Sequence, residues 1–218
     1  AIGLLVSEGL IDQGDVEHVA FDDPIEASHP ENRIVVHLRR PIDPSNIPQR
    51  TTIASASCGI CGKASIDDVV LRCGIPAPIE RIRLSALLAL PDALRGEQEI
   101  FGRTGALHAA AIVAVDGEGN LEIEAVREDV GRHNAVDKLI GAAAIRGALP
   151  YSGRLLFLSG RCSFELVQKA GAAGIGAIAA VGAPSDLAVE TAERLGICLI
   201  GFLRRDAANV YTRSDVVE

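Results

Sequence analysis

Two cysteines, Cys58 and Cys61, are the residues of this chain best suited to chemistry, and they lie in the segment Ser57-Cys-Gly-Ile-Cys-Gly-Lys63. A cysteine reacts as its thiolate, and a nearby lysine or helix N-terminus favours that form. The glycines beside them let another backbone or a bulky ligand approach closely. This spacing is compatible with a zinc half-site, a dithiol redox pair or a carrier of sulfur.

The zinc interpretation requires further ligands. A structural zinc site commonly uses two such cysteine pairs, or one pair with two histidines. The sequence has no second CxxC pair and no HxxxH spacing. His108 or His133 could complete a three-ligand site of the zinc-deaminase type, but those enzymes place a proline before the first cysteine. Ser57 stands at that position, so zinc is the less favoured alternative.

The redox and carrier interpretations differ in where the next helix begins. A thioredoxin-like pair is expected at the start of a helix that follows a strand. Here Ser65-Ile-Asp-Asp68 has the spacing of a capping box, which places the helix start after both sulfurs. We therefore expect the cysteines on a loop, which suits a group carrier whose sulfur must reach two sites. Two idle cysteines are the plain alternative.

Composition limits the class of protein. Hydrophobic residues make up 48% of the 218 residues and charged residues 23%, as in ordinary globular domains. An aromatic content of 3% and a net charge of -8 argue against a general nucleic-acid surface. We find no bilayer-spanning apolar run, and the odd number of cysteines favours a reducing cytoplasm over a disulfide framework. Because the chain lacks methionine and opens with helical apolar spacing, we expect a further segment before Ala1.

The apolar pattern predicts a mixed α/β sheet with helices on both faces. Strands are expected over residues 33–38 and 51–56, a helix over 65–73, and helical segments over 84–90 and 92–101 with a break near Pro91. Further strands are expected over 108–115, 121–127, 154–158, 177–181 and 197–203, with helices over 135–149, 164–172 and 186–195. We divide the chain into a small N-terminal α+β portion, residues 1–50, and a core, residues 51–218, that carries the cysteine loop.

The turns that leave the strands are rich in polar residues. Such turns converge on one edge of the sheet, where ligands bind. Four arginines in them, Arg132, Arg161, Arg204 and Arg205, would form a basic pocket that suits phosphates, together with helix N-termini.

Simpler roles are open for the other residues of these turns. Asn134, Ser163 and Ser185 can be helix caps, Arg161 can pair with Glu165, and His108 and His133 can be structural. Cys73, Cys162 and Cys198 are expected to be small packing residues.

Several of these segments together resemble one family, the formate dehydrogenase accessory sulfurtransferases (FdhD). The matching stretches are 57–65, 104–111, 127–138, 159–169, 183–189 and 201–212, and they extend over nearly the whole chain. The resemblance implies a cytidine-deaminase-like fold and a cytoplasmic homodimer. It also implies that a cysteine desulfurase supplies persulfide sulfur, which passes to the bis-molybdopterin guanine dinucleotide cofactor before this enters formate dehydrogenase.

The resemblance also assigns residues. Cys58 matches the persulfide-carrying cysteine, with Cys61 as its partner. The cofactor-binding stretch maps to Phe202, Leu203, Arg204, Arg205, Asp206 and Ala207. From the polar turns we add Arg132, His133, Asn134, Ser159, Arg161 and Ser185. A cofactor-binding chaperone without catalysis is the alternative function, and a zinc hydrolase on a deaminase-like scaffold is a more distant one.

Overall fold

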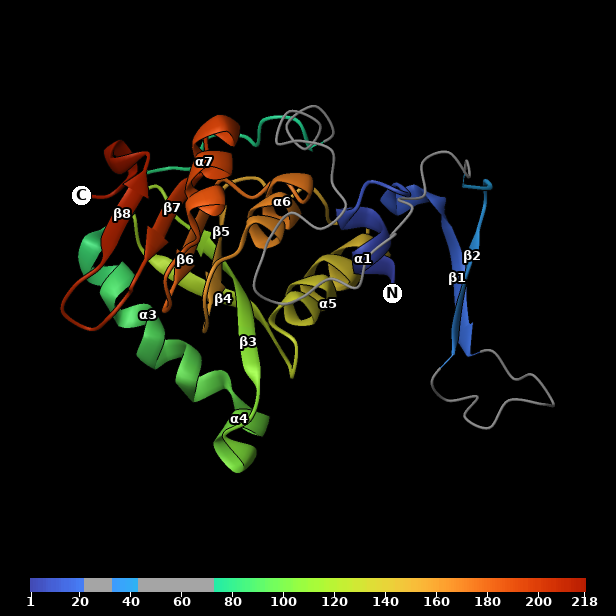
Figure 1. Cartoon of the computed structure of the whole chain (residues 1–218), viewed down its shortest axis with the longest axis horizontal. Coiled ribbons are helices and arrows are strands. Elements are labelled where there is room, and N and C mark those ends of the chain that lie inside the picture. Colours follow the sequence, from blue (N-terminus) through green and yellow to red (C-terminus); the bar gives the residue numbers. More distant parts are fainter. Residues whose placement is uncertain (22–32, 43–72) are drawn as a thin grey trace.

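The computed structural model describes residues 1–21, 33–42 and 73–218. Cys58, Cys61, the strand expected over 51–56 and nearly all of the helix expected over 65–73 lie outside these residues. The N-terminal part contains α1 (Ile2–Ser7), a short 3-10 turn (Gln13–Asp15) and the antiparallel strands β1 (Val16–Phe21) and β2 (Ile34–Leu38). These two strands form an arm that stands apart from the main sheet (Figure 1).

The main sheet has six strands in the order β4-β3-β5-β6-β7-β8. Its strands are β3 (His108–Val115), β4 (Leu121–Asp129), β5 (Arg154–Leu158), β6 (Ala177–Ala180), β7 (Cys198–Gly201) and β8 (Asn209–Thr212). Strands β5, β6 and β7 are parallel, and the β3–β4, β3–β5 and β7–β8 pairs are antiparallel. The predicted mixed α/β sheet is therefore confirmed.

Helices pack on both faces of this sheet (Figure 1). They are α3 (Leu84–Glu97), α4 (Glu99–Thr104), α5 (Arg132–Ile145), α6 (Phe164–Ala172) and α7 (Asp186–Leu195), and a 3-10 turn (Ser214–Val216) follows β8. Side chains alternate along a strand, so β3 sends Ala110 and Ile112 into the core shared with α5, α6 and α7. Ala109 and Val113 enter the core shared with α3. Burial on both faces explains why the inner strands β3, β5, β6 and β7 read as continuous apolar runs.

Several element boundaries differ from the sequence-based expectation, among them the end of α5, which is Ile145 rather than 149. Helix α3 continues through Pro91 because Leu87, Leu90 and Leu94 bury one continuous face against the sheet, which outweighs the lost backbone hydrogen bond. Helix α5 begins at Arg132 rather than at 135. Strand β7 ends at Gly201, because the next residue takes the left-handed conformation, with φ 51.

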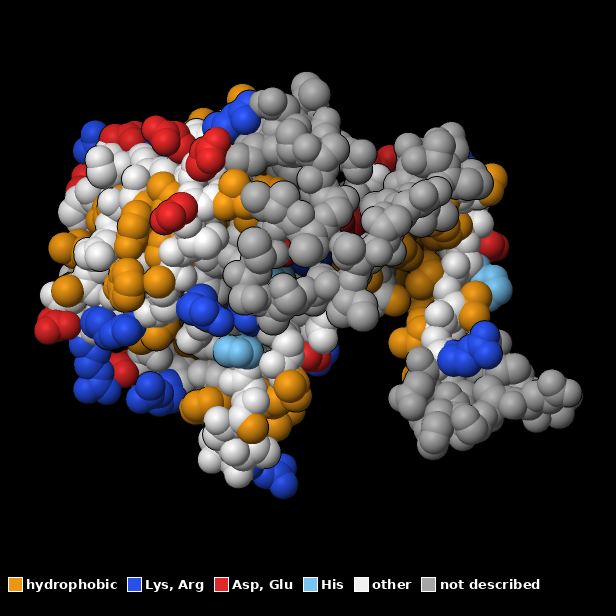
Figure 2. Space-filling model, viewed as in Figure 1, with side chains coloured by type: hydrophobic (Ala, Val, Ile, Leu, Met, Phe, Trp, Pro, Cys, Tyr) orange, Lys and Arg blue, Asp and Glu red, His pale blue; other side chains and the backbone are white. Residues whose placement is uncertain are grey.

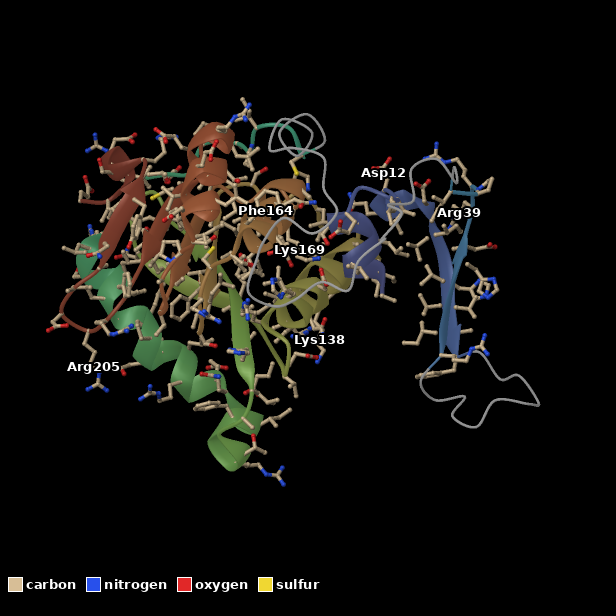
Figure 3. The ribbon with its side chains drawn as sticks, in the orientation of Figure 1. Asp12, Arg39, Lys138, Phe164, Lys169 and Arg205 are labelled. Atoms are coloured by element: carbon tan, nitrogen blue, oxygen red, sulfur yellow. The ribbon has the colours of Figure 1, made fainter. Side chains whose placement is uncertain are left out.

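Helix α1 is fastened to the main body by a close approach and a buried ion pair. A Cβ on Gly3 would collide with the backbone oxygen of Asp137 in α5, so the two helices can meet only at glycine. The ammonium of Lys169 lies 2.6 Å from Asp137 Oδ1 and donates to Ser7 Oγ at 2.8 Å. Figure 3 shows Lys169 where α6, α5 and α1 meet. Among the described residues, no helix is long and apolar enough to span a membrane.

Candidate functional site

The predicted basic edge of the sheet contains a pocket of about 900 Å³. Its floor is formed where three strands end, at Ser159 after β5, Val181 after β6 and Leu203 after β7. The opposite wall comes from α3, α4 and the start of β3. The volume lies within the range of ligand pockets in proteins, and the position is the usual one for ligands of α/β sheets.

Arginines on the turn after β7 give this pocket its charge. The Arg204 guanidinium donates from Nη1 to the carbonyls of Val181 and Leu203, which fixes it at the ends of β6 and β7. Arg205 forms a two-pronged ion pair with Asp92 of α3, with 2.8 Å between its Nη2 and Oδ1. Arg95 also lines the pocket. Figure 2 shows Lys and Arg side chains gathered over α3 and the turn after β7, and Figure 3 shows Arg205 at the outer rim.

The pocket also has polar groups on its inner wall. The Ser159 hydroxyl accepts a hydrogen bond from the N–H of Ala109 at 2.8 Å, and its own hydrogen is left to donate. The His108 ring packs on Gly160, where a Cβ would lie 3.1 Å from Nδ1. The sequence suggested that His108 is a structural residue of the core. It is instead half-buried and lines the pocket.

The last two residues of β4 hydrogen-bond to the starts of α4 and α5. The Glu128 carboxylate accepts hydrogen bonds from the N–H groups of Ile100 and Phe101, 2.9 and 2.8 Å away, and so caps α4. Asp129 Oδ1 accepts from the Gly131 N–H and from the Asn134 amide. Asn134 is therefore not the cap of α5 that the sequence suggested, because Gly131 occupies that position.

His133 and Arg132 begin α5 on the side of the sheet edge nearer α6. His133 Nε2 lies 3.0 Å from Ser163 Oγ and 3.7 Å from the Glu165 carboxylate. The interaction with this ring holds the pKa of Glu165 at about 2, against the opposing effect of burial. Among the described residues, Arg132 Nε is the one fully buried side-chain nitrogen or oxygen without a hydrogen-bond partner.

The structure brings only part of the predicted cofactor site together around the pocket. Ser159, Leu203, Arg204, Arg205 and Asp206 line it. Phe202 and Ala207 flank this stretch outside the lining. The residues Arg132, His133, Asn134, Arg161 and Ser185 are not among the residues that line the pocket either. Ser185 accepts a hydrogen bond from the Ala188 N–H and so caps α7, as the simpler interpretation holds.

Sequence reasoning missed the wall contributed by α3 and α4. Asp92, Gln98 and Phe101 line the pocket, but no strand precedes them, so a search of the turns that follow strands passes over them. His108 was the available signal. It begins a strand that runs antiparallel to β5, and so it reaches the same edge.

Two of the described cysteines are poorly suited to thiolate chemistry. Burial raises the pKa of Cys162 and of Cys198 to about 12, so both are thiols at neutral pH. Cys73 Sγ lies 3.6 Å from the Gln168 carbonyl, and none of the three forms a disulfide. Across residues 1–21, 33–42 and 73–218, no group of three or more His, Cys, Asp or Glu side chains could hold a metal ion.

Comparison with known proteins decides the family. The family model described as FdhD/NarQ matches residues 1–218. The chain belongs to the FdhD/NarQ family. It is 45% identical to the Sulfur carrier protein FdhD of Streptomyces coelicolor over 100% of this chain and 78% of the relative. It is 44% identical to the Sulfur carrier protein FdhD of Mycobacterium tuberculosis over 98% of this chain and 79% of the relative.

A solved structure has a similar fold. It is a crystal structure of a protein from Desulfotalea psychrophila, assigned as a formate dehydrogenase accessory protein. The two folds superpose with a TM-score of 0.71 over 100% of this chain and 77% of the other, at 20% sequence identity. The likeness concerns the fold alone.

Proposed function

We propose that this protein is a sulfur carrier that accepts persulfide sulfur on Cys58 and delivers it to the bis-molybdopterin guanine dinucleotide cofactor of formate dehydrogenase. The observation that carries the proposal is the pocket at the sheet edge, which Leu203, Arg204, Arg205 and Asp206 line. These residues belong to the stretch that the family resemblance assigns to the cofactor. The names of the relatives from S. coelicolor and M. tuberculosis supply the sulfur-carrying role.

The residues around the pocket fit a ligand of this kind. A guanine dinucleotide carries a pyrophosphate, and arginine binds phosphate oxygens with paired N–H groups. Arg95, Arg204 and Arg205 provide that charge at the rim, and Phe101 and Leu107, which are partly exposed, provide apolar surface for a ring. The cofactor is the substrate of this proposal, and the arginines would bind and orient it.

The choice of cysteine follows from the chemistry of the others. A persulfide forms by attack of a thiolate, so a thiol with a pKa of about 12 is a poor acceptor at neutral pH. Cys162 and Cys198 are therefore poor candidates for the cysteine that accepts sulfur. Cys58 and Cys61, with Lys63 beside them, have the flanking residues that favour thiolate. The free thiols elsewhere agree with a reducing compartment, and we propose the cytoplasm.

Sulfur transfer proceeds by thiol exchange: Cys58 is loaded, Cys61 releases the sulfur, and the resulting disulfide is reduced. The Cys58 thiolate attacks the outer sulfur of a persulfide on a cysteine desulfurase, and the S–S bond of the donor breaks to leave the donor thiolate. The Cys61 thiolate then attacks the Cys58 sulfur and releases the outer sulfur as hydrosulfide for the bound cofactor. The Cys58–Cys61 disulfide that remains is reduced by a cellular dithiol. Alternatively, Cys61 itself carries the sulfur.

Intact-protein mass spectrometry tests the proposal. After incubation with a cysteine desulfurase and cysteine, we expect a mass gain of one sulfur on the wild-type protein and none on Cys58→Ala. Cys162→Ala serves as the matched control, and it should gain sulfur like the wild type. A wild-type protein that stays unmodified would refute the carrier role. If it also bound a guanine nucleotide, the same pocket would support the chaperone function.

We also propose a homodimer, in which the arm packs against a second copy. The β1–β2 register places Val19, Phe21, Ile34 and Val36 on one face of the arm, opposite the stacked rings of His18 and His37. Figure 2 shows hydrophobic side chains along the side of the arm that faces the body. An isolated two-stranded ribbon is only marginally stable in water, so this apolar face requires a partner surface. Formate dehydrogenase, the proposed client, would meet the cofactor pocket instead.

A further inference from the structure

Gln98 is a buried polar residue of the pocket whose side-chain amide has no hydrogen-bond partner among the described residues. The residue is 8% exposed, and it lines the pocket at the junction of α3 and α4. Among the hydrogen bonds found in residues 1–21, 33–42 and 73–218, none involves its side-chain amide. A buried amide that lacks partners costs stability, by about 1 to 3 kcal/mol in typical cases. Because this amide faces an open pocket, water can satisfy it in the empty site, and a ligand that enters can take the place of that water.

The amide is not sealed inside the protein. Across the described part of the chain, Arg132 Nε is the fully buried side-chain nitrogen or oxygen that lacks a partner. The Gln98 amide, which also lacks one, therefore retains some contact with open space. The open space that this residue lines is the pocket.

The backbone around Gln98 is held in place by its neighbours. It ends α3 and precedes α4, with φ -86 and ψ 79, so it belongs to neither helix. The two hydrogen bonds from Ile100 and Phe101 to the Glu128 carboxylate tie the start of α4 to β4. The Gln98 carbonyl accepts from the Gly102 N–H at 3.0 Å. A side chain on such a fixed backbone loses little freedom when it binds a ligand.

We propose that Gln98 is a specificity-determining residue that reads the edge of the ligand's heterocycle. A primary amide presents one acceptor and one donor side by side. It therefore matches a planar ring that carries an N–H next to a C=O, as guanine and pterin rings both do. The inference rests on the proposed function, because that function supplies a guanine-bearing ligand. The arginines at the rim would hold the phosphates, and Gln98 would select the ring.

Isothermal titration calorimetry on the full chain at one fixed salt concentration separates these two roles. The probes are guanosine diphosphate and inorganic pyrophosphate. The variant Gln98→Met removes the amide at nearly constant volume, and Gln13→Met is the matched control. The Gln13 amide hydrogen-bonds the backbone of Leu149, in a part of the chain that does not line the pocket.

We expect Gln98→Met to bind guanosine diphosphate about tenfold more weakly than the wild type. Pyrophosphate binding should be unchanged, and Gln13→Met should match the wild type with both probes. A circular-dichroism melt checks that the variants are folded, and removal of an unpartnered amide should leave Tm the same or higher.

A modified ligand provides the second half of the test. N1-methylguanosine diphosphate lacks the ring N–H, so it should bind the wild type about tenfold more weakly than guanosine diphosphate. Gln98→Met should bind the two nucleotides equally. If Gln98→Met retains wild-type affinity for guanosine diphosphate, the inference is wrong and the proposed function stands. If the wild type binds no guanosine diphosphate at all, both are wrong.

Discussion

Two large cavities among the described residues are built in different ways. The pocket of about 900 Å³ lies where buried parallel strands end, and arginines and backbone groups surround it. The other, of about 1230 Å³, lies between the arm and the body, and Val19, Ile34 and the outer strand β4 are among the residues that line it. The first has the fixed polar groups that a small ligand needs. The second has exposed apolar side chains and an unpaired strand edge, which suit another protein chain.

This comparison predicts that the two cavities respond to different substitutions. The arm side depends on how α1 is fastened to α5. Lys169 is 4% exposed in its side chain, so Lys169→Met leaves the Asp137 carboxylate buried without its partner. We expect the free energy of unfolding to fall by about 3 to 5 kcal/mol, measured by urea denaturation.

Two further variants sharpen the Lys169 experiment. Arg154→Met breaks an exposed pair with Glu124 and should cost less than about 1 kcal/mol. The double variant Lys169→Met with Asp137→Leu removes the closest pair of buried charges and should regain part of the lost stability, because Glu8, 3.9 Å from the Lys169 ammonium, loses that cation in both variants. A loss as small as that of Arg154→Met would show that the buried pair does not hold α1 in place.

The second prediction concerns the apolar face of the arm. Phe21 is 71% exposed, and a charged residue there would be desolvated if a second copy covered it. Phe21→Glu should therefore weaken dimerisation at least about tenfold, measured by sedimentation over a concentration series. Ile75→Glu is the control, because Ile75 is similarly exposed, at 75%, but lies outside the two strands of the arm. Equal dimerisation of all three proteins would exclude the arm as the interface.

The main sheet could be predicted from the sequence better than the arm could. Buried strands such as Leu155–Leu158 are continuous apolar runs bounded by turn residues, so local pattern and tertiary burial agree. The strands β1 and β8 were not expected. β1 has exposed side chains along most of its length, and β8 has only four residues, of which two are exposed, so neither gives a buried apolar run.

The candidate site was predictable only where it follows strands. Ser159 and Arg204 leave strand ends, so the topology alone brings them together. Gln98 comes from a junction between two helices. Its position depends on the hydrogen bonds that the Glu128 carboxylate accepts from the start of α4, and Glu128 is about 30 positions farther along the chain. His133 was expected in the pocket, but it lies in the first turn of α5, which follows β4, and it contacts Ser163 instead. Side-chain contacts of this kind depend on packing that no local spacing encodes.

The third prediction concerns the contact of His133 with Glu165. Glu165 has a folded-state pKa of about 2, below its ordinary value of 4.5, because it interacts with His133. Its contribution to stability is therefore fully present above about pH 4.5 and is lost as pH falls through about 2. The carboxylate side chain is 35% exposed, and water screens it, so we expect a contribution of about 1 to 2 kcal/mol.

Urea unfolding from about pH 6 down to about pH 2 measures this effect, because that range covers the ordinary pKa of 4.5 and reaches the folded-state pKa of about 2. Glu165→Gln should show a smaller loss of stability on acidification than the wild type. Glu190→Gln is the matched control on α7, and it should follow the wild-type curve. Parallel curves for Glu165→Gln and the wild type would mean that the His133 contact does not stabilise the fold.

The smallest expected effect returns to the ligand pocket and its rim. Asp92 neutralises Arg205 through an exposed ion pair, which competes with any phosphate for the same guanidinium. Asp92→Asn removes the competing charge, so pyrophosphate should bind about two- to fivefold more tightly, measured by calorimetry at low salt. Arg205→Gln should have the opposite effect. Because the arm cavity contains neither residue, dimerisation should be the same in both variants, and a change there would mean that the two cavities are coupled.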